Sequence, residues 1–295
     1  MPDEPFVDTH AHFWDHSVEG LDWAWLKPGF TFRAWEGSAD LDAPQYLPPE
    51  LREEAAGAGL AGVVHVHAAD MTSDPVVETA WLQSVGDQHG WPDAIVGLCA
   101  LQRPDAPEVL QRHAQHDRFR GVRDPHALEW LDVDAVATGM DAATELGASV
   151  ELRRPDYEVD TLVELATRWP TTTILLSHGC FPLTRTDADR TTWAAAMRRL
   201  APHENVVCKI STLAGASDPG WTIDSIRPWV LTAVDVFGPD RCVLGSNFPV
   251  DRLFGTYVGV VDAYRASLST LAPHEQAAVL HGTAERVYGI DVTGS

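Results

Sequence analysis

The feature that most constrains this chain is a series of short apolar segments separated by helical patterns. Eight such segments are rich in Val, Ile and Leu and bounded by turn residues, as expected for buried β-strands. They are Phe6–His12, Gly62–His67, Ala94–Leu101, Phe119–Arg123, Ser149–Leu152, Thr172–His178, Val206–Ser211 and Cys242–Ser246. Because most are apolar almost throughout rather than at alternate positions, both faces of these strands are expected to be covered.

Helical patterns fill most of the gaps between these strands. A helix is expected from Pro48, and further ones at Asp74–His89, Pro107–Gln115, Asp132–Leu146, Asp160–Arg168, Arg190–Leu200, Ile223–Phe237, Thr256–Leu271 and Pro273–Tyr288. Eight alternations of strand and helix are typical of an α/β protein folded as a (β/α)8 TIM barrel. The alternative is an open doubly wound sheet, whose first strand normally ends in a glycine-rich phosphate-binding turn. Here that strand ends in His-Ala-His-Phe-Trp, so we predict a barrel, in a single domain over residues 1–295.

Charge and hydropathy exclude several classes of partner. The chain has 43 acidic and 21 Lys and Arg residues, a net charge of −22, which disfavours nucleic acid and anionic membrane surfaces. No apolar run reaches the roughly 18 residues of a membrane span, and the start lacks a secretory signal. We expect a cytoplasmic protein whose four dispersed cysteines are reduced core thiols. A homodimer is expected only from the general frequency of dimers.

A long insertion follows the first strand. About 35 residues precede the next helix, whereas such loops usually have about 2–6 residues. Four of the chain's 11 tryptophans lie here, among the aromatic residues Phe13, Trp14, Trp23, Trp25, Phe30, Phe32 and Trp35. In a barrel this aromatic-rich loop would cover the face where active sites form. The aromatic residues, Trp14 and Trp25 among them, either line a substrate pocket or form a satellite core that holds the loop.

The first strand carries the strongest functional motif, Val7-Asp8-Thr9-His10-Ala11-His12. Alternate residues of a strand share a face, so Asp8, His10 and His12 are expected on one side. Two imidazoles buried without partners are costly, and a divalent metal removes that cost, because neutral imidazole binds zinc. Asp8 is then expected to accept a hydrogen bond from one ring. Ordinary hydrogen-bonded core histidines are the alternative.

Two other strands end in polar residues that point to the same site. The segment Ile174–Gly179 ends in His178, and the glycine after it permits close approach of a ligand. His178 is a candidate third metal ligand, base or electrophile. Asn247 follows the eighth strand, which adjoins the first in a closed barrel, so it is expected near His10 and His12.

Basic side chains at strand ends suggest contacts to substrate. Arg123 ends the fourth strand and Arg153 follows the fifth, and a guanidinium group binds carboxylates in a bidentate manner. Each is a candidate clamp for a substrate oxygen, with a structural ion pair as the alternative. His67, on the second strand, lies nearer the predicted mouth than His65 and is a candidate substrate contact.

Two further ionisable residues lie inside predicted strands. Lys209 interrupts the apolar run Val206–Ile210, and a buried lysine requires a carboxylate partner or a catalytic role. Structural pairing is the favoured interpretation for Lys209. Glu151 is either a candidate member of a second metal set or, as the simpler interpretation, a buried partner of Arg153.

Together these motifs resemble the amidohydrolase-2 family, the metal-dependent hydrolases and decarboxylases of the amidohydrolase superfamily. The matching segments are Asp8–Trp14, Ser177–Pro182, Lys209–Ser211, Gly245–Asp251 and His281–Tyr288. The resemblance covers essentially the whole chain. It is closest to the branch of sugar-acid, pyrone-dicarboxylate and muconolactone-type lactonases, with aminocarboxymuconate-type decarboxylases more distant. The family fold is a (β/α)8 barrel, in agreement with the strand count.

The resemblance implies one divalent metal, often zinc, with manganese as another option, on His10, His12 and His178. Some lactonases of this kind are thought to work without a metal. Position 247 is Asn where many relatives have Asp, and an amide cannot take a proton from metal-bound water as a carboxylate can. Asp251 is expected to lie too far along the loop to replace that carboxylate.

The implied reaction is the opening of a lactone or related cyclic carbonyl compound by metal-activated water, with His178, Asn247 and Arg123 as catalytic residues. The substrate is expected to be a small molecule bearing a carboxylate or an aromatic group. A metal-assisted lyase, chiefly a decarboxylase, is the first alternative. A catalytically decayed barrel that only binds a ligand is the second.

Overall fold

The structure is a computed structural model that describes residues 4–27, 41–70, 74–124, 132–153, 159–182 and 184–292. Within these residues, eight parallel strands form one sheet in chain order. The strands are β1 (Phe6–Ala11), β4 (Leu60–Val66), β5 (Ala94–Leu98), β6 (Phe119–Arg123), β7 (Ser149–Leu152), β8 (Ile174–Leu176), β9 (Val206–Ile210) and β10 (Cys242–Leu244). Each strand overlaps a segment predicted from the sequence.

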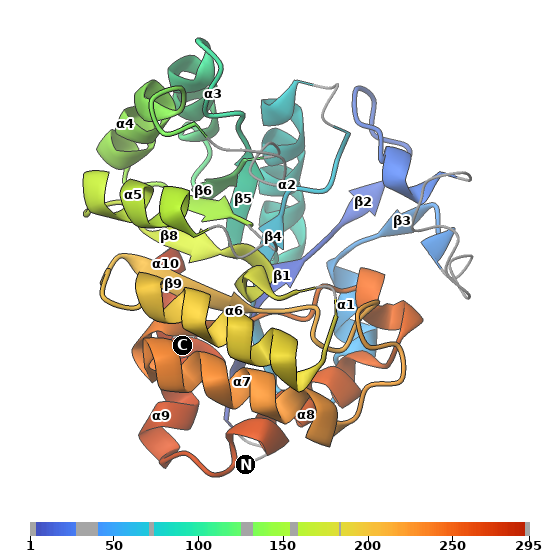
Figure 1. Cartoon of the computed structure of the whole chain (residues 1–295). Coiled ribbons are helices and arrows are strands. Elements are labelled where there is room, and N and C mark those ends of the chain that lie inside the picture. Colours follow the sequence, from blue (N-terminus) through green and yellow to red (C-terminus); the bar gives the residue numbers. More distant parts are fainter. Residues whose placement is uncertain are drawn as a thin grey trace.

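Helices follow the strands and pack around the outside of the sheet (Figure 1). They are α1 (Pro48–Glu54), α2 (Pro75–His89), α3 (Ala106–His113), α4 (Ala137–Leu146), α5 (Asp160–Arg168), α6 (Asp187–Leu200), α7 (Ile223–Phe237), α8 (Tyr257–Leu268), α9 (Pro273–Ala277) and α10 (Thr283–Tyr288). No helix among the described residues is both long and apolar enough to cross a bilayer.

Backbone hydrogen bonds join the first strand to the last and close the sheet. The His12 N–H donates to the Phe248 carbonyl at 2.8 Å, and the Asn247 N–H donates to the His10 carbonyl at 2.7 Å. The Thr9 hydroxyl donates to the carbonyl of Leu244 at 2.7 Å. The predicted (β/α)8 TIM barrel is therefore confirmed, and its closure brings residue 247 beside the His-Ala-His motif.

The strands are apolar on both faces because each face of the sheet packs in its own hydrophobic core. One core lies between the sheet and the surrounding helices. The other contains one side of the strands and the last helix, with the buried residues Val7, Val64, Val66, Ala94, Val96, Leu175, Val207, Val243, Ala284 and Tyr288. All four cysteines are buried, as expected for core thiols.

Several elements end earlier than the apolar patterns predict. The β8 strand stops at Leu176 because the chain turns at Ser177–Cys180, where His178 and Gly179 have left-handed backbone with φ of 50° and 55°. The final helical segment is divided into α9 and α10 by a π-helical turn at Ala278–Gly282. The sixth of the predicted helices starts earlier instead, at Asp187, where the Thr186 hydroxyl accepts a hydrogen bond from the Asp189 N–H and caps the helix.

The described part of the insertion after β1 forms a satellite core. Strands β2 (Trp14–Asp15) and β3 (Gln45–Tyr46) pair antiparallel. Trp14 is fully buried and stacks on Tyr46, with ring centroids 5.4 Å apart. Phe30, Phe32 and Trp35 lie outside the described residues.

Candidate active site

A bulge in β1 determines which side chains point toward the mouth. Asp8 pairs with Val63 and Ala11 with His65, so β1 has one residue more than β4 over this interval. As a result Asp8 does not share a face with the two histidines. Its carboxylate accepts a hydrogen bond from the Tyr257 hydroxyl of α8 at 3.0 Å. The prediction that Asp8 supports an imidazole ring is therefore wrong, because a bulge reverses the side-chain alternation.

Three histidines form a cluster at the ends of β1 and β8. The His10 ring centroid lies 4.9 Å from that of His12 and 4.4 Å from that of His178. Burial is the largest cause that lowers the pKa of each ring, to about 3 for His12. The cluster is therefore neutral at pH 7, which is the form of imidazole that binds metals.

The hydrogen bonds of the cluster are incomplete. Both ring nitrogens of His10 are buried and have no hydrogen-bond partner among the described residues. The His178 Nδ1 atom is paired with the Ser211 hydroxyl at 2.8 Å, so its Nε2 is the nitrogen left for a ligand. An imidazole that is buried without a partner is costly, and this is the observation that best fits a cation site.

Asn247 and Asp251 adjoin the cluster. The His12 Nε2 atom lies 3.3 Å from the Asn247 Oδ1 atom. The Asn247 Nδ2 group donates to the Asp251 Oδ1 atom at 2.8 Å. The helical turn Val250–Leu253 folds Asp251 back onto the Asn247 amide, and the expectation that Asp251 does not itself replace the missing carboxylate stays a prediction. Burial raises the pKa of the Asp251 carboxyl well above its usual value.

The donor set does not form a complete protein cage for a metal. Among the described residues, no three His, Cys, Asp or Glu side chains make up a metal-binding group. The neutral histidines and the amide oxygen of Asn247 are nevertheless suitable ligands for zinc or a similar cation. The residues thus fit a cation chemically, with an amide where a carboxylate would complete the set.

A cavity of about 220 Å³ opens beside the cluster and contains two arginines. It is lined by Arg153, His178, Phe181, Pro182, Arg185, Thr212, Ala216, Ser217, Asn247, Val250 and Asp251. The Arg153 Nε atom is buried without a hydrogen-bond partner among the described residues. Arg185 lies over the rings of Phe181 and Trp229 and donates to the Ser217 hydroxyl at 2.7 Å. Guanidinium groups in a small cavity are suited to an anionic substituent.

Sequence reasoning did not identify Arg185, because it lies in the loop before α6 rather than at a strand end. Glu151 was expected to pair with Arg153, and this is wrong. Its carboxylate forms a buried ion pair with Lys209 instead, which confirms a structural partner for that lysine. Arg153 is therefore not paired with Glu151, and it lines the cavity.

Arg123 and His67 lie on the side of the mouth formed by β4 and β6. The Arg123 Nη1 group donates to the His67 carbonyl at 3.5 Å, and burial lowers the pKa of Arg123. The His67 Nε2 atom lies 3.6 Å from the Glu78 carboxylate of α2, which also faces His65 at 3.5 Å. Glu78 is a second residue missed from the sequence, because nothing in the pattern of α2 shows that it is buried against two histidines.

The two tryptophans proposed as substrate contacts have different surroundings. Trp14 is fully buried in the satellite core, which supports the structural interpretation for this residue. Trp25 is half-buried, donates to the Ala68 carbonyl at 2.6 Å and has its ring centroid 6.3 Å from that of His12. Trp25 therefore lies beside the histidine cluster.

Backbone strain is concentrated around the same cavity. Among the described residues, the non-glycine residues with positive φ are His178 (50°), Cys180 (48°), Thr212 (59°) and Asn247 (59°). They follow β8, β9 and β10, and three of them line the cavity. Left-handed backbone at residues other than glycine is uncommon and recurs at functional sites.

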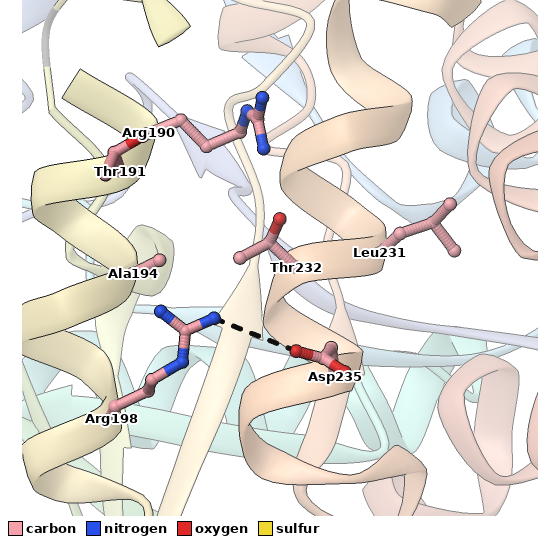
Figure 2. A pocket seen from close by; sticks show the side chains of 7 residues that line it. All are labelled: Arg190, Thr191, Ala194, Arg198, Leu231, Thr232 and Asp235. Atoms are coloured by element: carbon pink, nitrogen blue, oxygen red, sulfur yellow. Dashed lines mark ion pairs between the residues drawn. The ribbon is translucent and has the colours of Figure 1, made fainter. Parts of the chain in front are cut away.

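A second hollow, of about 400 Å³, lies outside the barrel between α6 and α7 (Figure 2). Arg190 and Arg198 extend from α6 toward α7. Arg190 pairs with Asp187 at 2.8 Å and Arg198 with Asp235 at 3.9 Å. Because these arginines already have acidic partners and none of the described residues that line this hollow is a histidine, the cavity at the barrel mouth is the better candidate for catalysis.

Comparison with known proteins identifies the family of the chain. The family model for amidohydrolases matches residues 7–290. An uncharacterized protein, y4mH, of Sinorhizobium fredii is 32% identical, over 98% of this chain and all of its own length. An L-fucono-1,5-lactonase of Burkholderia multivorans is 30% identical, over 96% of each chain. A crystal structure of a Burkholderia multivorans amidohydrolase with bound zinc superposes with a TM-score of 0.79 at 25% identity, covering 97% of this chain and 100% of that one. This chain belongs to the amidohydrolase family.

Proposed function

We propose that the protein is a metal-dependent hydrolase that opens a lactone or a related cyclic carbonyl compound. The observation that carries the proposal is the buried cluster of neutral histidines, in which His10 has two ring nitrogens without a partner. The cluster borders a cavity that can hold a small molecule. The lactonase relatives of Burkholderia support a cyclic ester as the substrate class.

His10, His12 and His178 would hold the metal, with zinc as the first choice of ion. A bound divalent ion would supply a water of lowered pKa and would stabilise negative charge on a carbonyl oxygen. The Ser211 hydroxyl fixes the His178 ring through Nδ1, so that Nε2 faces metal or substrate. The Asn247 amide neither accepts nor releases a proton at neutral pH, so Asn247 cannot act as a base. Its side-chain oxygen can instead contact the metal or the substrate.

The cavity selects the substrate. Arg153 and Arg185 are suited to bind a carboxylate, and the hydroxyls of Thr212 and Ser217 can bond to neutral oxygens of a sugar-like ring. Phe181 provides an apolar wall. We therefore propose that the substrate is a lactone that bears a carboxylate or several hydroxyls, with Arg123 and Trp25 at the opposite side of the mouth.

A decarboxylating lyase is the second candidate, because position 247 has an amide instead of the carboxylate that would activate water. The two reactions have different products. A lactonase consumes water and releases one acid equivalent, whereas a decarboxylase releases carbon dioxide.

The test uses protein purified without added metal, wild type beside His12→Ala, with the exposed His274→Ala of α9 as a matched control. We expect about one equivalent of zinc or manganese in wild type and control and loss of both metal and lactone hydrolysis in His12→Ala. Substrates would be L-fucono-1,5-lactone and a carboxylate-bearing lactone, with acid release followed by pH-stat and carbon dioxide measured in parallel.

Carbon dioxide release from a carboxylated substrate without lactone opening would favour the lyase. Full lactone hydrolysis by His12→Ala would contradict the proposed site. A metal-free wild type without turnover of any lactone would contradict the proposed function as a whole.

A further inference from the structure

We propose that Asp251 is a positioning residue that turns the side-chain oxygen of Asn247 toward His12 and thereby makes Asn247 a metal ligand. The inference rests on the metal-dependent function proposed above. It assigns a role to a carboxylate that lies four residues beyond the position where the family pattern places one.

The hydrogen bond of His12 determines its tautomer. The His12 Nδ1 atom lies 2.8 Å from the Val66 carbonyl oxygen. A carbonyl oxygen can only accept, so Nδ1 carries the proton and donates it. In a neutral imidazole the other nitrogen is then an acceptor, so Nε2 presents a lone pair to whatever faces it.

The group that faces this lone pair is another acceptor. The Asn247 Nδ2 group donates to Asp251 Oδ1 at 2.8 Å, which turns the amide so that its oxygen lies 3.3 Å from His12 Nε2. Without the carboxylate, the amide could rotate and donate from Nδ2 to the His12 nitrogen. The Asp251 side chain therefore holds two acceptors face to face in a buried site, which is unfavourable unless a positive group lies between them.

A divalent cation fits this arrangement. Two ligand atoms at about 2.0–2.2 Å from a tetrahedral zinc are separated by roughly 3.3–3.5 Å. The separation of 3.3 Å between the His12 nitrogen and the Asn247 oxygen lies in this range. A water that donates to both atoms is the alternative occupant, and it would leave Zn²⁺ affinity insensitive to Asp251→Asn.

The Asp251 side chain is well placed to hold the amide, because Oδ1 accepts from Nδ2 whether the carboxyl is ionised or carries its proton on Oδ2, which has no hydrogen-bond partner among the described residues. Asp251 is 2% exposed, and its N–H donates to the Asn247 carbonyl at 3.2 Å, which fixes the two residues relative to each other. Gly215 packs against the carboxylate, since a Cβ there would lie 3.0 Å from Asp251 Oδ1. Asn247 itself has a φ of 59°, a left-handed conformation that asparagine tolerates better than most residues.

The decisive variant is Asp251→Asn, which keeps the size of the side chain but can either donate to or accept from the Asn247 amide. The amide of Asn247 is then free to turn its Nδ2 group toward His12. We expect Zn²⁺ affinity to fall about 10- to 100-fold, as is typical when a residue that supports a metal ligand is changed. The melting temperature of the metal-free protein should be unchanged or higher, because the facing acceptors are relieved.

Affinity would be measured by titrating metal-stripped protein with Zn²⁺ against a competing chelator, and melting would be followed in EDTA. The control is Asp93→Asn, a carboxylate that accepts from the Val63 N–H at 2.7 Å at the other end of the barrel. Because an asparagine oxygen can still accept from the Val63 N–H, this variant should leave both the metal-free melting temperature and the Zn²⁺ affinity nearly unchanged. The exchange Asn247→Asp with Asp251→Asn restores a fixed oxygen opposite His12 and should recover most of the affinity.

Unchanged Zn²⁺ affinity in Asp251→Asn would overturn the inference while leaving the proposed function in place. So would a loss of metal-free stability in Asp251→Asn that accounts for the lower affinity, since that pattern indicates a purely structural hydrogen bond. A wild-type protein that binds no Zn²⁺ would overturn both the inference and the proposed function.

Discussion

Individual residues at the ends of β8, β9 and β10 hold conformations that most side chains avoid. Thr212 is the clearest case, because its branched Cβ makes a φ of 59° more costly than it is for Asn247. Such strain persists only where the surrounding structure enforces it. The positions of strain and of the candidate chemistry coincide, since Thr212, His178 and Asn247 line one cavity.

Replacing Thr212 with asparagine should therefore stabilise the protein. We expect Thr212→Asn to raise the free energy of unfolding by about 1 kcal/mol, because asparagine adopts left-handed backbone more readily. Chemical denaturation at pH 7.5 measures the change. The matched control Thr192→Asn, in the ordinary helical backbone of α6, should give no gain. Equal destabilisation of both variants would show that the left-handed conformation at Thr212 carries no strain.

At the scale of elements, one buried histidine joins helix α3 to the barrel. His113 of α3 occupies space left by Gly97 of β5, where a Cβ would lie 2.7 Å from the ring. Its Nδ1 atom pairs with the Thr79 hydroxyl at 2.9 Å, and its Nε2 atom donates to the Leu98 carbonyl at 3.0 Å. The ring also stacks on Phe119. Burial lowers the pKa of His113 to about 4, from 6.5 in the unfolded chain.

Because of this lowered pKa, the free energy of unfolding depends on pH through His113. Between pH 6.5 and 4 the unfolded state binds the His113 proton and the folded state does not, so stability falls as the pH falls. At pH 5.5 the loss from this one residue is about 1.4 kcal/mol. His113→Gln should be less stable than wild type at pH 7.5, and the difference should be about 1.4 kcal/mol smaller at pH 5.5. Urea denaturation at both pH values tests this, and a constant difference would contradict the shifted pKa.

The elements were more predictable than the site. Buried parallel strands are recognisable in the sequence as continuous apolar runs. The ends of these runs predicted that four residues lie near one another, and the structure confirms this for His10, His12, His178 and Asn247. The bulge in β1 has no such signature, because one extra backbone residue changes no side-chain pattern. The contributions of Glu78, Arg185 and Asp251 come from how helices and turns fold back onto the barrel. That depends on contacts between residues distant in the sequence, or on the tight turn at Val250–Leu253.

At the scale of the whole molecule, a buried polar cluster ties both ends of the chain to the barrel. Lys209 of β9 pairs with Glu151 of β7 and donates to the Thr9 carbonyl of β1 at 2.8 Å. The Tyr288 hydroxyl of α10 donates to the same Glu151 carboxylate at 3.1 Å. A charge pair in this position is stable only while both members are present, because either charge alone would be buried without compensation.

A double-mutant cycle tests this cluster. Glu151→Leu should lower the free energy of unfolding by about 3–5 kcal/mol, because it leaves Lys209 charged in an apolar interior. Adding Lys209→Met should recover most of that loss, since a well-packed apolar pair avoids the desolvation penalty. Denaturation of the two single variants and the double variant measures the coupling. Additive effects of the two changes would show that the ion pair contributes nothing beyond each side chain alone.

The closure of the barrel also has a consequence for the order in which the protein is made. His10 and His12 leave the ribosome more than 230 residues before Asn247 and Asp251 emerge. The hydrogen bonds from Asn247 and His12 that join β1 to the end of β10 can form only then. A nascent chain therefore carries its histidine pair without the rest of the site while the residues between them are made. Any function of this site begins only when β1 has met the segment that follows β10.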